Sequence, residues 1–220
     1  MTPDLVVFDF DGVLVDSEVI SNEVLAAALT ALDYPLSEAE CRRRFTGLKI
    51  EAIRVMIETE RGRALSPRLE GMVRDESYRR LGSELKMVPG ADVLLRNLRG
   101  PRCIASNSGP RWIDLGLRTT GLETFFPPEI RFSAAQVARS KPAPDVFLHA
   151  AASMGTDPAA CVVIEDSVHG IAAACAAGMR VLGFTGASHI DAGHAAVLQG
   201  AGALALFDDL TALPDLLARL

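Results

Sequence analysis

The sequence lacks the cysteine and histidine spacings that usually hold a metal ion or a disulfide framework. It contains four cysteines and four histidines, and no two cysteines form a C-x-x-C pair. They stand apart at Cys41, Cys103, Cys161 and Cys175, and at His149, His169, His189 and His194. Isolated thiols of this kind are typical of reduced, mostly buried side chains in a reducing compartment. We therefore expect a cytoplasmic protein in which His169 faces solvent or caps a helix rather than acting in catalysis.

An excess of basic residues is also missing, as is any long apolar run. The formal net charge of the 220 residues is −6, which argues against nucleic acid or an anionic membrane as a partner. The run Arg42-Arg43-Arg44 is typical of a solvated helix face. No apolar segment reaches the roughly 18 residues of a membrane span, and the N-terminus lacks a signal-peptide pattern. The absences and the length predict a soluble protein of one large or two small domains.

What the sequence does contain is an alternation of short apolar runs with helical patterns. The runs occupy residues 5–8, 103–105, 161–164, 181–184 and 204–207. Because they are apolar on both faces, they predict central strands of a parallel sheet. Helical patterns occupy residues 90–98, 111–119, 144–154, 168–177 and 210–217. We predict a doubly wound, Rossmann-like α/β core.

The alternation stops between the first two runs, where about seventy residues contain no strand pattern. Helices are expected at 19–32, 37–45, 50–59 and 67–85. Ser37 and Glu40 form a capping box at the start of one of them. This segment predicts an inserted domain of four helices. We therefore assign residues 1–15 and 88–220 to the core and residues 16–87 to the insertion.

Two acids follow the first apolar run, in Asp9-Phe10-Asp11-Gly12. Side chains of a strand alternate between faces, so Asp9 and Asp11 share one side while Phe10 points into the core. Ligand sites collect at the carboxyl ends of strands in open α/β sheets. The pair suits a carboxylate nucleophile with a second carboxyl group beside it, although a DxD pattern alone more often marks an acidic turn.

Further polar segments follow at the ends of other core elements. Residues 106–109, with the sequence SNSG, could bind a phosphate through hydroxyl and N–H groups or could simply cap a helix. Lys141 lies in a proline-rich segment that fixes its backbone, whereas an ordinary loop lysine faces solvent. Glu165 and Asp166 end another run and could bind a metal ion or cap the next helix.

Together these segments predict one rim with at least four carboxylates and a fixed cation. The acids are Asp9, Asp11, Glu165 and Asp166. So many carboxylates repel one another strongly unless a hard cation joins them. Oxygen ligands beside a phosphate-like site favour Mg²⁺ as that cation.

In the order DFDGVLVDSE, SNS, SKPAPDVF and IEDS, these segments resemble the motifs of the haloacid dehalogenase superfamily over essentially the whole chain. The helical insertion is similar to that of the branch with phosphoglycolate phosphatases, β-phosphoglucomutases and sugar-phosphate phosphatases. VDSEVIS, RRFTGLKIEAI and DDLTALPDL resemble the bacterial 6-phosphogluconate phosphatase type. The resemblance implies a helical cap and an Mg²⁺-dependent phosphatase of small phosphorylated metabolites, sugar or sugar-acid phosphates among them.

The resemblance also implies a chemical role for each core residue. Asp9 would attack phosphorus and form an aspartyl-phosphate. Asp11 would protonate the leaving alcohol and then take a proton from the water that hydrolyses the intermediate. Ser106, the backbone amide of Asn107 and Lys141 would hold the phosphoryl oxygens and the developing charge.

The implied metal site shares two of these residues. Mg²⁺ would be held by the Asp9 carboxylate, the Asp11 backbone carbonyl and Asp166. Glu165 would ligate the ion directly or through water. No motif position of the superfamily is missing from the chain.

Two other functions stay open beside the phosphatase. β-Phosphoglucomutases carry a histidine and an arginine where this chain has Ser21 and Ile50, although Lys49 could replace the arginine's charge. The loss of these partners favours hydrolysis over intramolecular transfer. A non-catalytic metabolite-binding module is disfavoured by the intact motifs. Asp11 also argues against dehalogenase and phosphonate-hydrolase chemistry, because members with those activities lack an acid there.

Substrate contacts are expected on the cap. The candidates are Glu18, Ser21, Asn22, Thr46, Gly47, Leu48, Lys49 and Arg74. Gly47 would allow close backbone approach, and Lys49 would meet an anionic group such as a sugar-acid carboxylate, unless it is an ordinary surface lysine. Arg74 could instead pair with a helix acid. We expect hinges at 15–18 and 86–90, and a monomer whose partner is a small phosphorylated metabolite.

Overall fold

The computed structural model describes residues 3–45, 48–190 and 193–220, and the chain divides into two compact units. The first comprises Met1–Asp16 and Lys86–Leu220, and the second comprises Ser17–Leu85. The boundaries expected from the sequence, 16 and 87, fall beside these limits.

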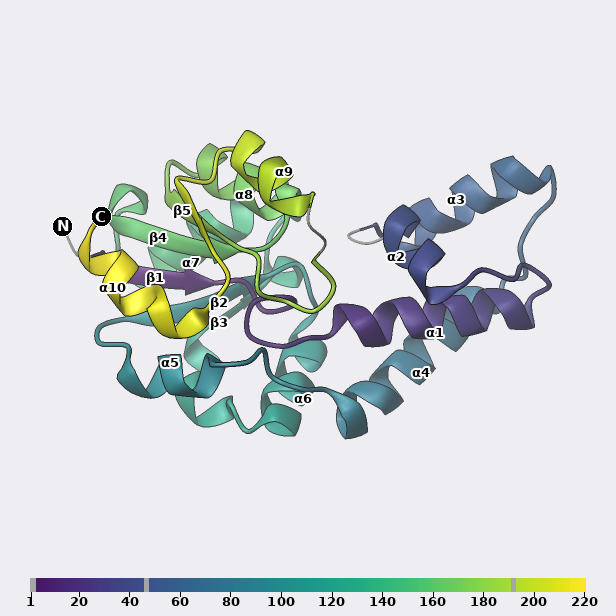
Figure 1. The fold of residues 1–220 in the computed structure, drawn as a ribbon, viewed down its shortest axis with the longest axis horizontal. Coiled ribbons are helices and arrows are strands. Elements are labelled where there is room, and N and C mark those ends of the chain that lie inside the picture. Colours follow the sequence, from purple (N-terminus) through teal and green to yellow (C-terminus); the bar gives the residue numbers. More distant parts are fainter. Residues whose placement is uncertain (1–2, 46–47, 191–192) are drawn as a thin grey trace. The chain divides into compact units, whose positions relative to one another are not determined.

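A six-stranded parallel sheet forms the centre of the first unit as far as the structure describes it (Figure 1). Its spatial order is β3-β2-β1-β4-β5-β6. The strands are β1 (Leu5–Phe8), β2 (Arg102–Ser106), β3 (Arg131–Ser133), β4 (Cys161–Glu165), β5 (Arg180–Phe184) and β6 (Ala205–Phe207). The chain runs from β1 outward to β3 and then returns to β4 on the other side of β1. The switch point, where such sheets bind ligands, therefore lies at the carboxyl ends of β1 and β4.

Helices cover both faces of this sheet. They are α5 (Ala91–Asn97), α6 (Pro110–Thr120), α7 (Asp145–Ser153), α8 (Val168–Ala176), α9 (His194–Gly200) and α10 (Leu213–Ala218). Figure 1 shows α8 and α9 on one side of the sheet and α5 and α6 on the other. Val7 of β1 shares a buried cluster with Phe147 of α7 and Ile171 of α8, whereas Phe8 packs edge-on against Phe126 with 6.2 Å between ring centroids. The predicted doubly wound α/β core is confirmed.

The differences from the prediction lie at the edges of the sheet. The run at 204–207 was expected to be central, but β6 is an edge strand with Ala205 exposed. β3 was not predicted, because Phe132 stands alone between two polar residues and gives no apolar run. The seven residues of α9 were likewise too few for a clear helical period. The expected helix at 210–217 is a 3₁₀ turn, Leu210–Ala212, followed by α10.

The second unit contains four helices among its described residues. They are α1 (Glu18–Ala31), α2 (Glu38–Phe45), α3 (Ile50–Arg61) and α4 (Leu69–Glu84). Leu29, Phe45 and Ile57 are buried in a common cluster. The Ser37 N–H donates to Glu40 Oε2 at 2.9 Å and the Glu40 N–H donates to Ser37 Oγ at 3.2 Å, so the predicted capping box is present.

The two chain segments that connect the units run side by side at their core ends. The Asp16 N–H donates to the Lys86 carbonyl at 2.9 Å, and the Val88 N–H donates to the Leu14 carbonyl at 3.0 Å. Val15 and Met87 form an antiparallel bridge between these bonds. The helical unit therefore leaves and rejoins the core at one place.

The cysteines match the prediction of separate thiols. Cys41, Cys103 and Cys161 are buried, Cys175 is exposed, and all four are free. Burial raises the pKa of Cys41 and Cys161 to about 11, so both stay protonated at neutral pH. Within the described residues, every helix is too short or too polar to cross a bilayer.

Candidate active site

The first two acids stand where β1 ends. The Asp9 N–H donates to the Ile164 carbonyl at 3.0 Å, which extends the pairing of β1 with β4 by one residue. The chain then turns at Gly12, whose φ is +77°, a value that favours glycine. Phe10 is fully buried between the two acids, as the alternation of the strand predicts. Gly12 also gives room to a neighbour, because a Cβ there would lie 1.9 Å from Asp166 Oδ2.

Lys141 is the cation at the centre of the site. Its Nζ donates to Asp9 Oδ1 at 2.8 Å, to Glu165 Oε1 at 2.7 Å and to the Ala105 carbonyl at 2.8 Å. Its side chain is 3 % exposed. Asn107 holds the backbone of this residue, because its Oδ1 accepts from the Lys141 N–H at 2.9 Å. The ammonium group is therefore fixed from β1, β2 and β4 together.

Burial and charge shift the pKa of these groups in opposite directions. Burial raises the pKa of Asp9 to about 6, against the lowering effect of Lys141. Burial and the charge of Asp9 raise the pKa of Asp166 well above its ordinary value. For Lys141, burial favours the neutral amine, but Asp9 and Glu165 outweigh it and raise the pKa. The site thus holds more carboxylates than its own cation neutralises.

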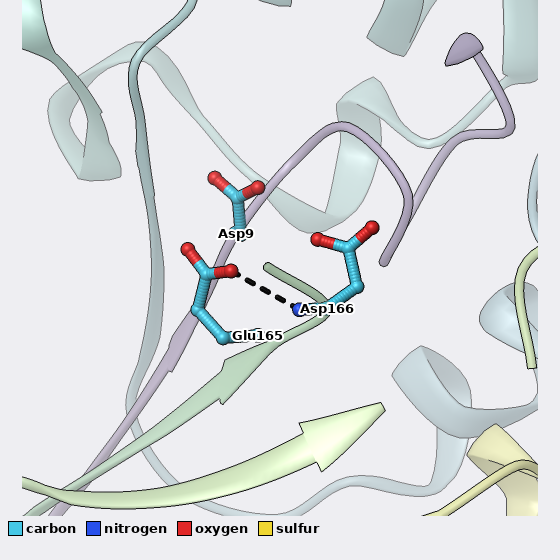
Figure 2. Close-up of side chains that lie close together, drawn as sticks. All are labelled: Asp9, Glu165 and Asp166. Carbon is cyan, nitrogen blue, oxygen red and sulfur yellow. Dashed lines mark hydrogen bonds between the residues drawn. The ribbon is translucent and has the colours of Figure 1, made fainter. Parts of the chain in front are cut away.

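Three carboxylates converge closely enough to hold a metal ion. Asp9, Glu165 and Asp166 each offer an oxygen within 4.8 Å of the others, and Figure 2 shows them converging from the ends of β1 and β4. A set of buried carboxylate oxygens suits a hard divalent cation such as Mg²⁺. The raised pKa of Asp9 and Asp166 fits the same conclusion, since a cation would stabilise their ionised forms.

Glu165 differs from the other two acids because protein donors engage both of its oxygens. Oε1 accepts from Lys141 Nζ, and Oε2 accepts from the Asp166 N–H at 3.1 Å, the Ser167 N–H at 3.1 Å and Ser167 Oγ at 2.9 Å. Gly170 permits this packing, because a Cβ there would lie 1.7 Å from Glu165 Oε1. These contacts favour Asp9 and Asp166 as the carboxylates that would hold the ion directly.

Asp11 receives two hydrogen bonds that the sequence analysis did not foresee. Ser108 Oγ lies 2.5 Å from Asp11 Oδ2, and Trp112 Nε1 donates to Asp11 Oδ1 at 2.8 Å. Both partners come from the segment after β2, whose last residue, Ser106, is buried and accepts at its Oγ from the Ser108 N–H at 3.1 Å. The SNSG pattern marked this loop, but no local signal marked Trp112.

Two histidines of the C-terminal part contact Asp166. His189 Nε2 lies 3.2 Å from Asp166 Oδ2, and His194 Nε2 lies 2.6 Å from the Asp166 carbonyl oxygen. His169, the histidine nearest this loop in sequence, is exposed, which agrees with its expected solvent-facing position. Sequence analysis assigned no role to His189 or His194, because their contacts depend on where the segment after β5 returns.

The predicted substrate contacts of the helical unit lie on three elements. Glu18, Ser21 and Asn22 are in the first turns of α1, where the Asn22 side-chain amide donates to the Glu18 carbonyl at 2.7 Å. Leu48 and Lys49 are exposed just before α3, and Thr46 and Gly47 lie outside the described residues. Arg74 pairs with Asp75 at 2.9 Å on the exposed surface of α4, so the expected alternative of pairing with a helix acid is present.

Comparison with known proteins identifies the family of the chain. A family model, haloacid dehalogenase-like hydrolase, matches residues 3–178. The 6-phosphogluconate phosphatase of Escherichia coli is 32% identical over 185 residues, covering 84% of this chain and 83% of that protein.

Solved structures extend the likeness over nearly the whole chain. A conserved haloacid dehalogenase-like protein of unknown function from Agrobacterium tumefaciens is 43% identical, with a TM-score of 0.91 and coverage of 98% of both chains. A family hydrolase from Deinococcus radiodurans with bound phosphate and sodium is 32% identical, with a TM-score of 0.83 and coverage of 99% of this chain and 96% of that one. The resemblance inferred from the motifs is thereby confirmed, and the chain belongs to the haloacid dehalogenase-like hydrolases.

Proposed function

We propose that the chain is an Mg²⁺-dependent phosphatase of small phosphorylated metabolites that works through an aspartyl-phosphate on Asp9. The observation that carries the proposal is the placement of Asp9: a buried carboxylate, 2.8 Å from a fixed ammonium group and within 4.8 Å of two further acids. Family membership and the phosphatase activity named for the E. coli relative support the same reaction class.

The reaction divides into two displacements. In the first, the Asp9 carboxylate attacks phosphorus, the bond to the leaving oxygen breaks, and Asp11 gives its proton to that oxygen. In the second, Asp11 takes a proton from water, the water oxygen attacks phosphorus, and the bond to Asp9 breaks. Each turnover consumes one water and restores both carboxyl groups.

The remaining residues position the reactants and stabilise charge. Lys141 holds Asp9 and would bind the oxygens of a phosphoryl group on Asp9, together with Ser106 at the end of β2 and the backbone amide of Asn107. Asp9, Asp166 and the Asp11 carbonyl would hold Mg²⁺ directly, and Glu165, expected to ligate directly or through water, would act through water because protein donors engage both of its oxygens. The ion would supply electrostatic stabilisation of the phosphoryl oxygens. Since Glu165 accepts from Lys141 and from the segment after β4, it would also fix the lysine.

The helical unit, residues 17–85, is proposed to act as a cap that excludes water and supplies substrate contacts. The paired segments at Asp16 and Lys86 fit the expected hinges. Glu18, Ser21, Asn22, Thr46, Gly47, Leu48 and Arg74 remain candidate contacts. Lys49, exposed just before α3, would bind the carboxylate of a sugar-acid phosphate such as 6-phosphogluconate. We expect the enzyme to act as a cytoplasmic monomer.

The test is phosphate release from a panel of sugar phosphates, sugar-acid phosphates, phosphoglycolate and nucleotides, with Mg²⁺ and with EDTA. The proposal expects release that requires Mg²⁺ and is greatest on sugar or sugar-acid phosphates. β-Glucose 1-phosphate with a trace of its bisphosphate serves as a contrast, with glucose 6-phosphate followed separately. Isomerisation with little release would identify a mutase instead, and no release under any condition would point to a binding module.

A further inference from the structure

We propose that Trp112 and Ser108 are positioning residues for proton transfer: together they orient the Asp11 carboxyl group and determine which of its oxygens carries the proton. The inference rests on the proposed phosphatase function and adds a part that the motifs do not contain. Its basis is the pair of contacts on Asp11, 2.8 Å from Trp112 Nε1 to Oδ1 and 2.5 Å from Ser108 Oγ to Oδ2.

The two partners differ in what they can do chemically. An indole N–H only donates, so Trp112 keeps Oδ1 as an acceptor in both protonation states of Asp11. A hydroxyl group both donates and accepts, so Ser108 can donate to the ionised carboxylate and accept from the protonated acid. The transferable proton is thereby assigned to Oδ2. That proton goes to the leaving oxygen as its bond to phosphorus breaks, and water returns a proton to Oδ2 when it attacks the aspartyl-phosphate.

The segment that carries both partners is itself held in place. Ser133 Oγ, buried at the end of β3, donates to the Ser108 carbonyl at 2.6 Å. The backbone N–H of Ser108 donates to Ser106 Oγ. The backbone N–H of Trp112 donates to the Gly109 carbonyl at 3.0 Å, in the first turn of α6. The Asp11 partners are thus fixed to β2 and β3. An unconstrained carboxyl group on a turn would sample several rotamers, and each wrong one misplaces the proton.

Leaving-group dependence gives the decisive test. An alkyl phosphate needs a proton on its leaving alcohol, whereas p-nitrophenyl phosphate leaves as a stable phenolate and needs little acid catalysis. Trp112→Phe keeps an aromatic ring but removes the donor, and Ser108→Ala removes the hydroxyl. We expect each to lower kcat/KM, which reports the step in which the leaving group departs, by about tenfold or more on glucose 6-phosphate and 6-phosphogluconate, with less than about a twofold change in kcat/KM on p-nitrophenyl phosphate.

The matched control is Thr119→Val, on the same helix, because the Thr119 hydroxyl donates only to its own helix at Leu115, 2.9 Å away, among the contacts described. It should leave both activities unchanged. Equal loss by Trp112→Phe and Ser108→Ala on the two substrate classes, or no loss on either, would overturn the proposal. Failure of wild-type enzyme on both classes would instead refute the phosphatase function.

A second readout does not depend on turnover. Trp112 is the only tryptophan in the sequence, so intrinsic fluorescence reports on this one indole. Asp11→Leu removes both acceptors at nearly constant volume and should change the emission maximum or intensity, whereas Asp75→Leu on the surface of the helical unit should not. Superimposable spectra for wild type and Asp11→Leu would contradict the contact itself, even if a Trp112 variant failed to fold.

Discussion

Nζ of Lys141 lies 2.8 Å from Oδ1 of Asp9, although 132 positions separate the two residues in the chain. The contact joins a buried ammonium group to a buried carboxylate, and the same nitrogen reaches Glu165, whose side chain is fully buried. Removing the lysine would leave two buried acids without their counter-charge.

Lys141→Met should therefore destabilise the protein by about 3–5 kcal/mol, the usual cost of breaking a buried ion pair from one side. Urea unfolding in EDTA measures the change. Lys86→Met serves as the matched control, because Lys86 is exposed and should change the free energy of unfolding by no more than about 0.5 kcal/mol. A Lys141 variant as stable as the control would contradict a central structural role for this cation.

Asp9→Asn should abolish turnover while leaving the fold intact, because the amide is nearly isosteric and a poor nucleophile. A loss of at least about 10³-fold in kcat is expected, since the substitution removes the group that forms the intermediate. Phosphate release and circular dichroism are the measurements. Near-normal hydrolysis by this variant would remove Asp9 from its proposed role, and the exposed Asp75→Asn should retain full activity.

Gly12→Ala should prevent Mg²⁺ binding, because its Cβ would lie 1.9 Å from Asp166 Oδ2 and displace that carboxylate. Gly121→Ala separates this effect from backbone strain. Gly121 has a φ of +73°, close to the +77° of Gly12, but open space where its Cβ would be. Both variants should lose about 1–2 kcal/mol of stability from the left-handed backbone, but only Gly12→Ala should lose the Mg²⁺-induced rise in Tm. Equal Mg²⁺ responses would argue against Asp166 as a ligand.

The Mg²⁺ response should depend on pH. Burial raises the pKa of Asp9 to about 6 in the folded protein from 3.8, so the folded state binds this proton more tightly than the unfolded state does. This contribution to stability is present below about pH 4 and is lost as the pH rises through 6. Mg²⁺ should reverse the loss, since it binds the ionised carboxylate, and its affinity should fall by at least about tenfold per pH unit below 6, because the raised pKa of Asp166 adds a second competing proton.

Thermal unfolding at pH 5 and pH 7.5, with Mg²⁺ and with EDTA, measures this effect. At 100 times its Kd, the ion should add about 2.7 kcal/mol at pH 7.5, and much less at pH 5. Asp9→Asn in EDTA should lack the part of the pH dependence that comes from Asp9. A Mg²⁺-induced Tm rise of the same size at both pH values would show that Asp9 ionisation is not linked to metal binding.

Lys49→Ala should weaken the binding of acidic sugar phosphates more than the binding of neutral ones. The exposed ammonium just before α3 is proposed to meet a sugar-acid carboxylate. A rise of about fivefold to tenfold in KM for 6-phosphogluconate is expected, equal to about 1 kcal/mol of a charge-assisted contact. KM for glucose 6-phosphate should change by less than about twofold. Equal effects on the two substrates would show that Lys49 does not recognise the carboxylate.

The sequence predicted which acids stand at the strand ends better than it predicted the contacts around them. Asp9 and Glu165 were identifiable because each follows an apolar run directly, and Asp166 because it comes next in the chain; such runs form neighbouring parallel strands. Trp112, His189 and His194 were not identifiable, because their contacts depend on which loops and helices return to the same edge. β3 was missed for a related reason: its pairing with β2 stabilises a segment whose own residues carry no strand period.

The hydrogen bonds between Asp16 and Lys86 and between Leu14 and Val88 have a consequence for how such proteins can be rebuilt. These bonds pair residues 14–16 with residues 86–88 as the stem of a hairpin. In topological terms, the four helices between the two segments are the long loop of that hairpin. Antiparallel segments at this spacing need only a two-residue turn to be joined. The sheet could therefore keep its order if the whole insertion were exchanged for another module or for a short turn.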